Sequence, residues 1–269
     1  MNKTLLALAS TVALAALPQW ASAQTTPAAP EPAPAEAASP LSFNVSLTSD
    51  YRYRGISQTR LKPAIQGGAD YAFASGFYVG TWASTIKWIK DAESANGVDA
   101  KGSVEWDLYG GYKGEIAKDL TYDVGVLAYV YPSNKYGDIP GAANANTTEI
   151  YGALTYGPAT LKYSHSVTNL FGFADSKNSG YVDLSATFEV GPAIQLIPHV
   201  GYQRVAHYSD FSYTDYSFTV GKDFSGFFVS AAVVGADTKS INGVKAYASP
   251  ANGKDLGKTS LVVAVKKTF

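Results

Sequence analysis

Charged side chains at alternate positions are the residues of this sequence best spaced for chemistry. Asp50, Arg52 and Arg54 lie two residues apart, and Glu105 and Asp107 repeat that spacing. In an extended strand, side chains two residues apart point to the same face. Each set therefore predicts a charged face, where carboxylates and guanidinium groups can bind ions or pair with one another.

Two other groups of residues have side-chain types that could form a site. The segment Ser164–Ser166 places two serines beside His165, as a nucleophile and a base. Neighbours on a strand point to opposite faces, so neither serine is expected to reach that histidine. Glu105 and Asp107 share a face and have the ligand chemistry for Ca²⁺ with loop carbonyls. We expect no catalytic residue, no cofactor site and no metal site.

Composition narrows the classes of protein. The chain has 269 residues, of which 46% are hydrophobic and 16% charged, yet its mean hydropathy is −0.05. Its 21 basic and 22 acidic groups give a net charge of −1, which argues against nucleic acid as a partner, because phosphate binding needs a basic surplus. The lack of cysteine excludes disulfides and thiolate metal sites.

The charged positions belong to segments of about ten residues with a period of two, which is the pattern of a transmembrane β-barrel strand. In the first segment Phe43, Val45 and Leu47 form the apolar face, which Tyr51 and Tyr53 continue as part of an aromatic girdle. The other segments are 64–74, 77–87, 103–114, 119–131, 147–156, 159–168, 180–190, 193–205, 212–221, 226–237 and 258–269.

This pattern predicts an all-β protein: an antiparallel barrel of about twelve strands, with both termini periplasmic. A soluble β-sandwich also alternates, but the tyrosines and tryptophans that edge the apolar face favour the barrel. We find no helical period after the first 40 residues. The connectors alternate between five short turns, such as 114–118 and 222–225, and six generally longer loops, as expected for periplasmic turns and extracellular loops.

The ends of the chain indicate export and membrane insertion. Residues 1–23 predict a cleaved signal peptide, with Lys3, an apolar stretch and the small residues Ala21-Ser22-Ala23. Residues 24–40 are rich in alanine and proline and predict a disordered leader, which leaves 41–269 for the barrel. The last segment ends on Phe269, in the form that the barrel-assembly machinery reads, so we expect that machinery and outer-membrane lipid as partners.

The stretch Asn44-Val45-Ser46-Leu47-Thr48-Ser49-Asp50-Tyr51-Arg52-Tyr53-Arg54-Gly55-Ile56-Ser57-Gln58-Thr59 resembles the first strand of the TorF family of proteobacterial outer-membrane proteins. The similarity continues through Pro63–Gly68 and Gly76–Gly80, and it covers the barrel region. The resemblance implies a cell outer membrane location and a pore, and it implies no particular solute.

If the polar face lines the lumen, the charged side chains become pore-lining candidates. These candidates are Asp50, Arg52, Arg54, Glu105, Asp107, Glu149, Asp183 and Asp215. A narrow lumen with more acids than bases favours cations, or zwitterions held by both signs. The alternative is that Arg52 and Arg54 pair with facing carboxylates and brace the wall.

The function expected from the sequence is a narrow passive channel for small solutes or ions, and not an enzyme. Barrels of eight strands are filled by side chains and those of sixteen hold an aqueous channel, so twelve strands predict a narrow pore. Two alternatives remain open. One is a non-conducting outer-membrane barrel with a structural or adhesin role, and the other is a membrane-embedded hydrolase.

Overall fold

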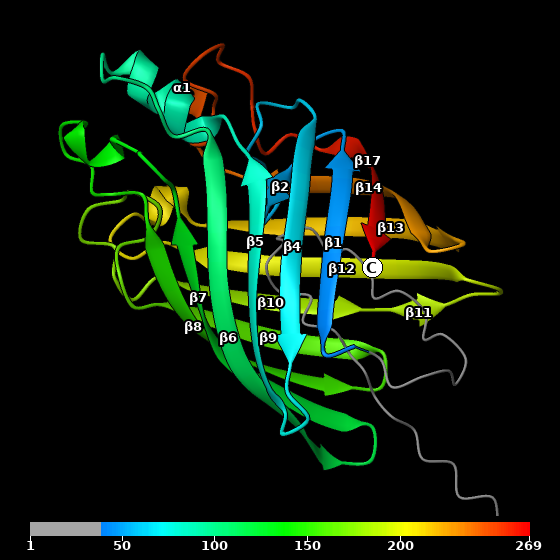
Figure 1. Cartoon of the computed structure of the whole chain (residues 1–269). Helices are drawn as coiled ribbons and strands as arrows, with labels where there is room; N and C mark the ends of the chain where they lie inside the picture. The colour runs from blue at the N-terminus through cyan, green and yellow to red at the C-terminus, as the bar shows by residue number, and fades with distance from the viewer. Residues whose placement is uncertain (1–38) are drawn as a thin grey trace, which may run out of the picture.

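The alternating segments form a closed antiparallel β-barrel in the computed structural model, which describes residues 39–269 (Figure 1). The predicted signal peptide, 1–23, and nearly all of the predicted leader, 24–40, lie outside the described residues. In the part of the chain that the structure describes, no helix has the length and apolar character needed to cross a membrane.

The barrel wall has twelve strands when the short β11 is counted as the continuation of β10, so the predicted number is confirmed. Their bounds are β1 (Leu41–Thr48), β4 (Ala64–Ala72), β5 (Phe77–Thr85), β6 (Val104–Ala117), β7 (Leu120–Val130), β8 (Thr147–Tyr156), β9 (Ala159–Ser166), β10 (Gly180–Ala186), β11 (Phe188–Glu189), β12 (Ile194–Arg204), β13 (Tyr213–Phe224), β14 (Phe227–Asp237) and β17 (Ser260–Thr268).

Each strand pairs with its neighbours in the chain, and the first and last strands close the ring. β1 pairs with β17 in a register that places Asn44 opposite Thr268 and Thr48 opposite Ala264. The start of β1 and the end of β17 therefore lie at the end of the barrel that has the short turns. The long connectors gather at the opposite end of the barrel. Closure leaves no unpaired sheet edge, as a membrane-spanning sheet requires.

Two strands run further than the sequence indicates. The turns expected at 114–118 and 222–225 are shorter in the structure, because β6 continues to Ala117 and β13 to Phe224. The extra residues pair with β7 and β14, with a bulge between Glu115 and Ala117. Backbone pairing extends these hairpins through polar residues that favour turns. The sequence pattern therefore placed the ends of β6 and β13 too early.

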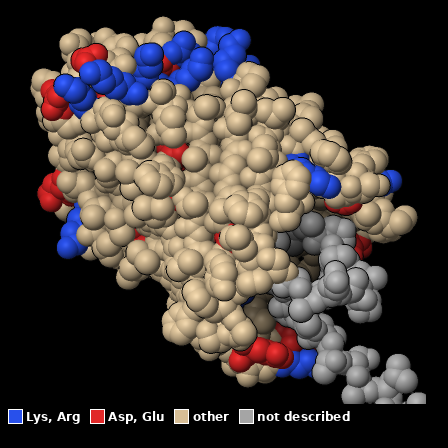
Figure 2. Space-filling view, in the orientation of Figure 1, with Lys and Arg blue, Asp and Glu red and all other residues tan. Residues whose placement is uncertain are grey.

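The wall exposes apolar side chains and buries charged ones, which is the reverse of the arrangement in a soluble protein. Large apolar side chains such as Leu47, Ile65 and Leu161 are 53%, 61% and 52% exposed, whereas Asp107 and Glu149 are 0% and 2% exposed. Figure 2 shows the result on one face: the strands present a surface almost free of charge, and Lys and Arg gather at the end with long loops.

The interior is closely filled, because tyrosine rings lie against glycines of adjacent strands. A Cβ atom on Gly111 would stand 2.4 Å from the hydroxyl of Tyr78, and one on Gly201 would stand 2.0 Å from that of Tyr181. Only glycine leaves room for the ring at these two positions. The glycines thus allow large side chains to point into a narrow barrel.

The long connectors contain short elements that no sequence period indicated. They are β2 (Arg52–Tyr53), β3 (Ile56–Ser57), α1 (Trp88–Ala95), η1 (Tyr136–Asp138), η2 (Ser209–Phe211), β15 (Ser240–Ile241) and β16 (Val244–Lys245). The helix α1 corrects the expectation of an irregular loop there. Its Ile89 is fully buried in the cluster that contains Tyr51 and Tyr131, so tertiary packing stabilises a helix only eight residues long.

Candidate functional site

The predicted first strand is wrong beyond Thr48, and this error defines the site. β1 ends at Thr48, and the segment Asp50–Thr59 turns into the barrel as the β2–β3 hairpin; in Figure 1, β2 is seen between β4 and β5. Tyr51, expected in an outer aromatic girdle, is 0% exposed. We call Asp50–Thr59 the inward segment.

Asp50 and Arg52 hold the inward segment in shape. One carboxylate oxygen of Asp50 accepts hydrogen bonds from Ser57 Oγ at 2.5 Å and Thr59 Oγ1 at 3.0 Å, and the other accepts from Arg52 Nε at 2.5 Å. Arg52 Nη1 also donates to the carbonyl oxygens of Gly55 and Leu256, at 2.9 and 3.0 Å. The guanidinium group thus links the segment to the connector before β17.

Arg54 extends into the lumen. Its neighbour Gly55 lies against β13 and β14, where an added Cβ would stand 2.7 Å from the carbonyl oxygen of Gly235. The guanidinium group reaches β8, where Nη2 and Nη1 lie 2.7 and 3.1 Å from the two carboxylate oxygens of Glu149. Nη1 also donates to Gln203 Oε1 on β12 at 2.5 Å. One side chain therefore connects β8 and β12, which β9 and β10 separate in the wall.

Arg54 is also enclosed by rings and remains charged. Its guanidinium carbon lies 4.1 Å from the ring centroid of Tyr181 and 4.7 Å from that of Tyr53. Burial opposes the charge, but the Glu149 carboxylate together with the hydroxyls of Tyr53 and Tyr129 outweighs burial and raises the pKa of Arg54 well above its ordinary value. The guanidinium group therefore stays charged over the physiological pH range, and it forms an ion pair with Glu149.

The two tyrosines of the inward segment complete its contacts with the wall. Tyr51 donates to Glu105 Oε1 at 2.6 Å and packs edge-on against Trp82, while Tyr53 donates to the hydroxyl of Tyr129 at 3.0 Å. Burial raises the pKa of both tyrosines, so both hydroxyls stay protonated as donors. These contacts extend from β5 to β7.

Asp107 is the least satisfied charged side chain of the lumen. It is 0% exposed, and within residues 39–269 neither of its carboxylate oxygens has a hydrogen-bond partner. It shares one face of β6 with Glu105, and Glu149 lies on the nearby β8. A buried carboxylate without a partner is costly, so this position attracts a cation or a proton.

The remaining two candidates, Asp183 and Asp215, lie beside His199, which the sequence prediction left outside the site. His199 Nε2 lies 2.6 Å from Asp183 Oδ2, and Nδ1 lies 3.6 Å from Asp215 Oδ1. Tyr181 donates to Asp215 at 3.0 Å. His199 shares the phase of the buried Gln195 and Gln203 on β12, and this phase is the sequence signal that could have added it to the site.

The structure thus brings the eight candidates into one region at the loop end of the lumen, but not as one sheet face. Asp50, Arg52 and Arg54 belong to the inward segment. The other five, Glu105, Asp107, Glu149, Asp183 and Asp215, point inward from the wall. Arg54, Glu149 and Asp215 lie around the tip of the segment, whereas the ion pair of Arg52 among the described residues is with Asp50 of its own segment.

A second polar group fills the lumen toward the short turns. Tyr78 donates to Asp123 at 2.6 Å and contacts the hydroxyl of Tyr151, and Tyr109 donates to Asp70. The amino group of Lys162 lies 4.1 Å from the ring centroid of Tyr151. Acidic and basic groups thus continue along the barrel below the inward segment.

The structure also places the residues of the two other sites considered from the sequence. Among residues 39–269, no group of three or more His, Asp or Glu side chains is arranged to hold a metal ion. The ring nitrogens of His165 lie 3.2 Å from the Tyr163 hydroxyl and 3.2 Å from Asn178 Oδ1, while Ser164 and Ser166 are buried. The serines and the histidine therefore face different surroundings, as the strand phase predicted.

Comparisons with known proteins agree on the fold. The KdgM porin, solved in complex with disordered oligogalacturonate, matches with a TM-score of 0.51 at 8% identity, over 85% of this chain and 98% of that one. The NanC porin, in a rhombohedral crystal form, matches with a TM-score of 0.50 at 9% identity, over the same shares. At such identities the likeness concerns the barrel alone.

Sequence comparison gives the family. No curated protein matches the sequence. The narrower resemblance to the TorF family stays a prediction. The model of a family described as "Bacterial protein of unknown function (Gcw_chp)" matches residues 33–269, so the chain belongs to that family.

Proposed function

We propose that this protein is an outer-membrane channel for small solutes, in which the inward segment narrows the lumen. The observation that carries the proposal is the closed barrel with apolar side chains outside and charged side chains inside. Apolar side chains exposed around a whole barrel are stable in lipid, and buried charges are stable along an aqueous path. The KdgM and NanC porins share this barrel fold.

The proposed path passes the eight pore-lining candidates. Six of them are acids and two are arginines, and Arg52 is already neutralised by Asp50. The acidic surplus and the unpartnered Asp107 favour cations over anions. KdgM was solved with an oligogalacturonate, a polyanion that an acidic lumen would disfavour.

The proposed outer-membrane location rests on the apolar outer face of the barrel and on the two ends of the chain. Residues 1–23 direct export in this proposal, and the signal is cleaved. The final strand with Phe269 guides insertion by the barrel-assembly machinery. Both termini are then periplasmic, and the connector that contains the inward segment enters the lumen from outside the cell.

Planar lipid bilayers test the channel. Purified protein should give discrete conductance steps, small because Arg54 extends into the lumen, and a salt gradient should give a reversal potential on the cation-selective side. The absence of steps at every voltage, from protein shown to be folded, would overturn the channel.

A non-conducting barrel is the second candidate, and one observation favours it. Hydrogen bonds join the inward segment to β8, β12 and the connector before β17, and a segment held in this way closes the lumen at this level. Wild-type protein without conductance, together with conductance in a variant that lacks the segment, would select this structural role.

A further inference from the structure

A basic pocket lies at the loop end of the barrel, apart from the lumen. It has a volume of about 590 Å³, and three connectors line it: the inward segment's connector, the connector with α1, and the one before β17. Its lining includes Arg60, Lys87, Lys90, Ser94, Ser103 and Pro250. None of these residues belongs to the predicted pore.

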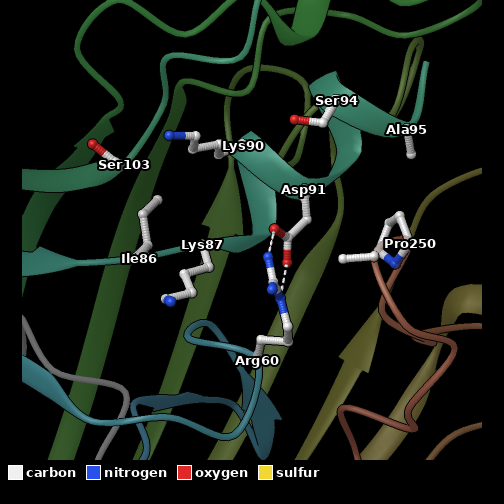
Figure 3. Close-up of a pocket in the computed structure, with 10 residues that line it drawn as sticks. Arg60, Ile86, Lys87, Lys90, Asp91, Ser94, Ala95, Ser103 and Pro250 are labelled. Carbon is white, nitrogen blue, oxygen red and sulfur yellow. Dashed lines mark hydrogen bonds and ion pairs between the residues drawn. The ribbon is translucent and has the colours of Figure 1, made fainter. Parts of the chain in front are cut away.

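The pocket has more positive than negative charge. Asp91 pairs with Arg60, whose Nε donates to it at 2.7 Å (Figure 3). Lys87 and Lys90 are exposed, and Figure 3 shows their amino groups extending to the same side of α1. Neither lysine takes part in an ion pair found among residues 39–269. Two ammonium groups therefore remain available to an anion.

The pocket adjoins the apolar surface of the barrel. Lys87 follows Thr85, the last residue of β5, in the phase that points away from the lumen. Ile65 and Val104, on the adjacent strands β4 and β6, are exposed apolar side chains at the same end. Figure 2 shows Lys and Arg side chains in a row above this uncharged face. An anion in the pocket could thus carry acyl chains that lie on the barrel.

We propose that this pocket binds the phosphate of a phosphorylated lipid of the outer leaflet. The inference rests on the proposed outer-membrane location. Lys87 and Lys90 supply positive charge to the phosphate, Ser94 and Ser103 supply hydroxyl donors, and the apolar belt below accepts the acyl chains. Asp91 keeps Arg60 in place at the edge of the pocket.

Native mass spectrometry of the full chain in detergent tests the proposal, with diphosphoryl lipid A as the probe. The double variant Lys87→Gln/Lys90→Gln should bind the lipid about tenfold more weakly than wild type, because both ammonium groups are lost. Lys118→Gln/Lys177→Gln removes the same charge from exposed lysines elsewhere and should bind normally. Equal binding by both double variants would overturn the site.

Two further arms identify the source of the phosphate. Dephosphorylated lipid A should bind wild type as weakly as the pocket variant binds the intact lipid. Inorganic phosphate should compete only at far higher concentration, because it has no acyl chains; competition at equal concentration would overturn the lipid assignment.

Conductance separates this inference from the proposed function. In bilayers of neutral lipid, Lys87→Gln/Lys90→Gln should conduct as wild type does. A wild-type protein that binds the lipid without conducting contradicts the channel alone, whereas a conducting protein with no phosphate-dependent binding contradicts the pocket alone.

Discussion

Arg54 is the residue on which the site depends most. Its contacts reach β8, β12 and the ring of Tyr181, and it approaches from a segment that rests on β13 and β14. A charge placed in a narrow lumen both blocks the path and repels cations. Residue 54 thus sets the size and the selectivity of the proposed channel together.

Replacement of Arg54 by alanine should increase conductance and cation selectivity. The variant removes a guanidinium group from the lumen and leaves Glu149 without its partner, at a cost of about 3–5 kcal/mol for a buried pair. Reversal potentials in a salt gradient give the selectivity. Arg54→Lys keeps the charge and should lie closer to wild type; unchanged potentials in Arg54→Ala would place the side chain away from the path.

Asp107→Asn tests the acidic half of the same region. The amide has the size of the carboxylate but no charge, so cation selectivity should decrease while the barrel remains folded. Asp119→Asn, at the exposed turn between β6 and β7, is the matched control and should conduct as wild type does. A reversal potential that is the same in both variants would argue against a cation at Asp107.

At the scale of elements, the inward segment is distinct from the wall that surrounds it. The wall strands are joined by continuous ladders, whereas β2 and β3 pair over only two residues each. Side-chain contacts and single backbone hydrogen bonds, such as that from Ser57 N to the Leu256 carbonyl oxygen, hold the segment in the lumen in place of a ladder. It can therefore be removed without breaking a wall strand.

Replacement of Tyr51–Gln58 by a short Gly-Ser linker should leave a folded barrel with a larger conductance. The linker spans from Asp50 to Thr59, which already lie close through the hydrogen bond between Asp50 and Thr59. Heat-modifiable migration in detergent gels checks folding independently of conductance. A folded variant with the conductance of wild type would show that another part of the lumen limits the flow.

At the scale of the whole molecule, closure joins the two ends of the described chain. β17 pairs with both β1 and β14, and the backbone of Phe269 exchanges hydrogen bonds with that of Phe43 at 2.8 and 3.1 Å. The last strand is thus needed before the ring can close. Assembly should depend on it more than on any loop.

Deletion of Phe269 should reduce insertion into the outer membrane and leave synthesis unchanged. The variant loses its two backbone hydrogen bonds to Phe43 and the terminal aromatic side chain. The measurement is the folded fraction in isolated outer membranes, read from heat-modifiable migration. Phe224→Leu, an exposed aromatic at the same end, controls for the loss of one ring. Equal folded fractions would argue against a role for the terminus.

The sequence by itself determined the barrel, its number of strands and the inward face of each strand. Period-two alternation is local, so Glu105 and Asp107 could be assigned to the lumen from their own neighbours. It also gave most strand bounds closely, and it failed where pairing continued into polar residues, as at Ala117. The lipid outside and the water inside impose this pattern on every strand.

Only the tertiary structure decided where residues 50–59 lie. Their alternation is the same as that of β1, so the sequence predicted one long strand with Tyr51 on its outer face. The segment instead enters the lumen because Arg54 meets Glu149, 95 positions away, and Arg52 meets Leu256, 204 positions away. Such contacts exist only after the barrel has closed, and no local pattern records them.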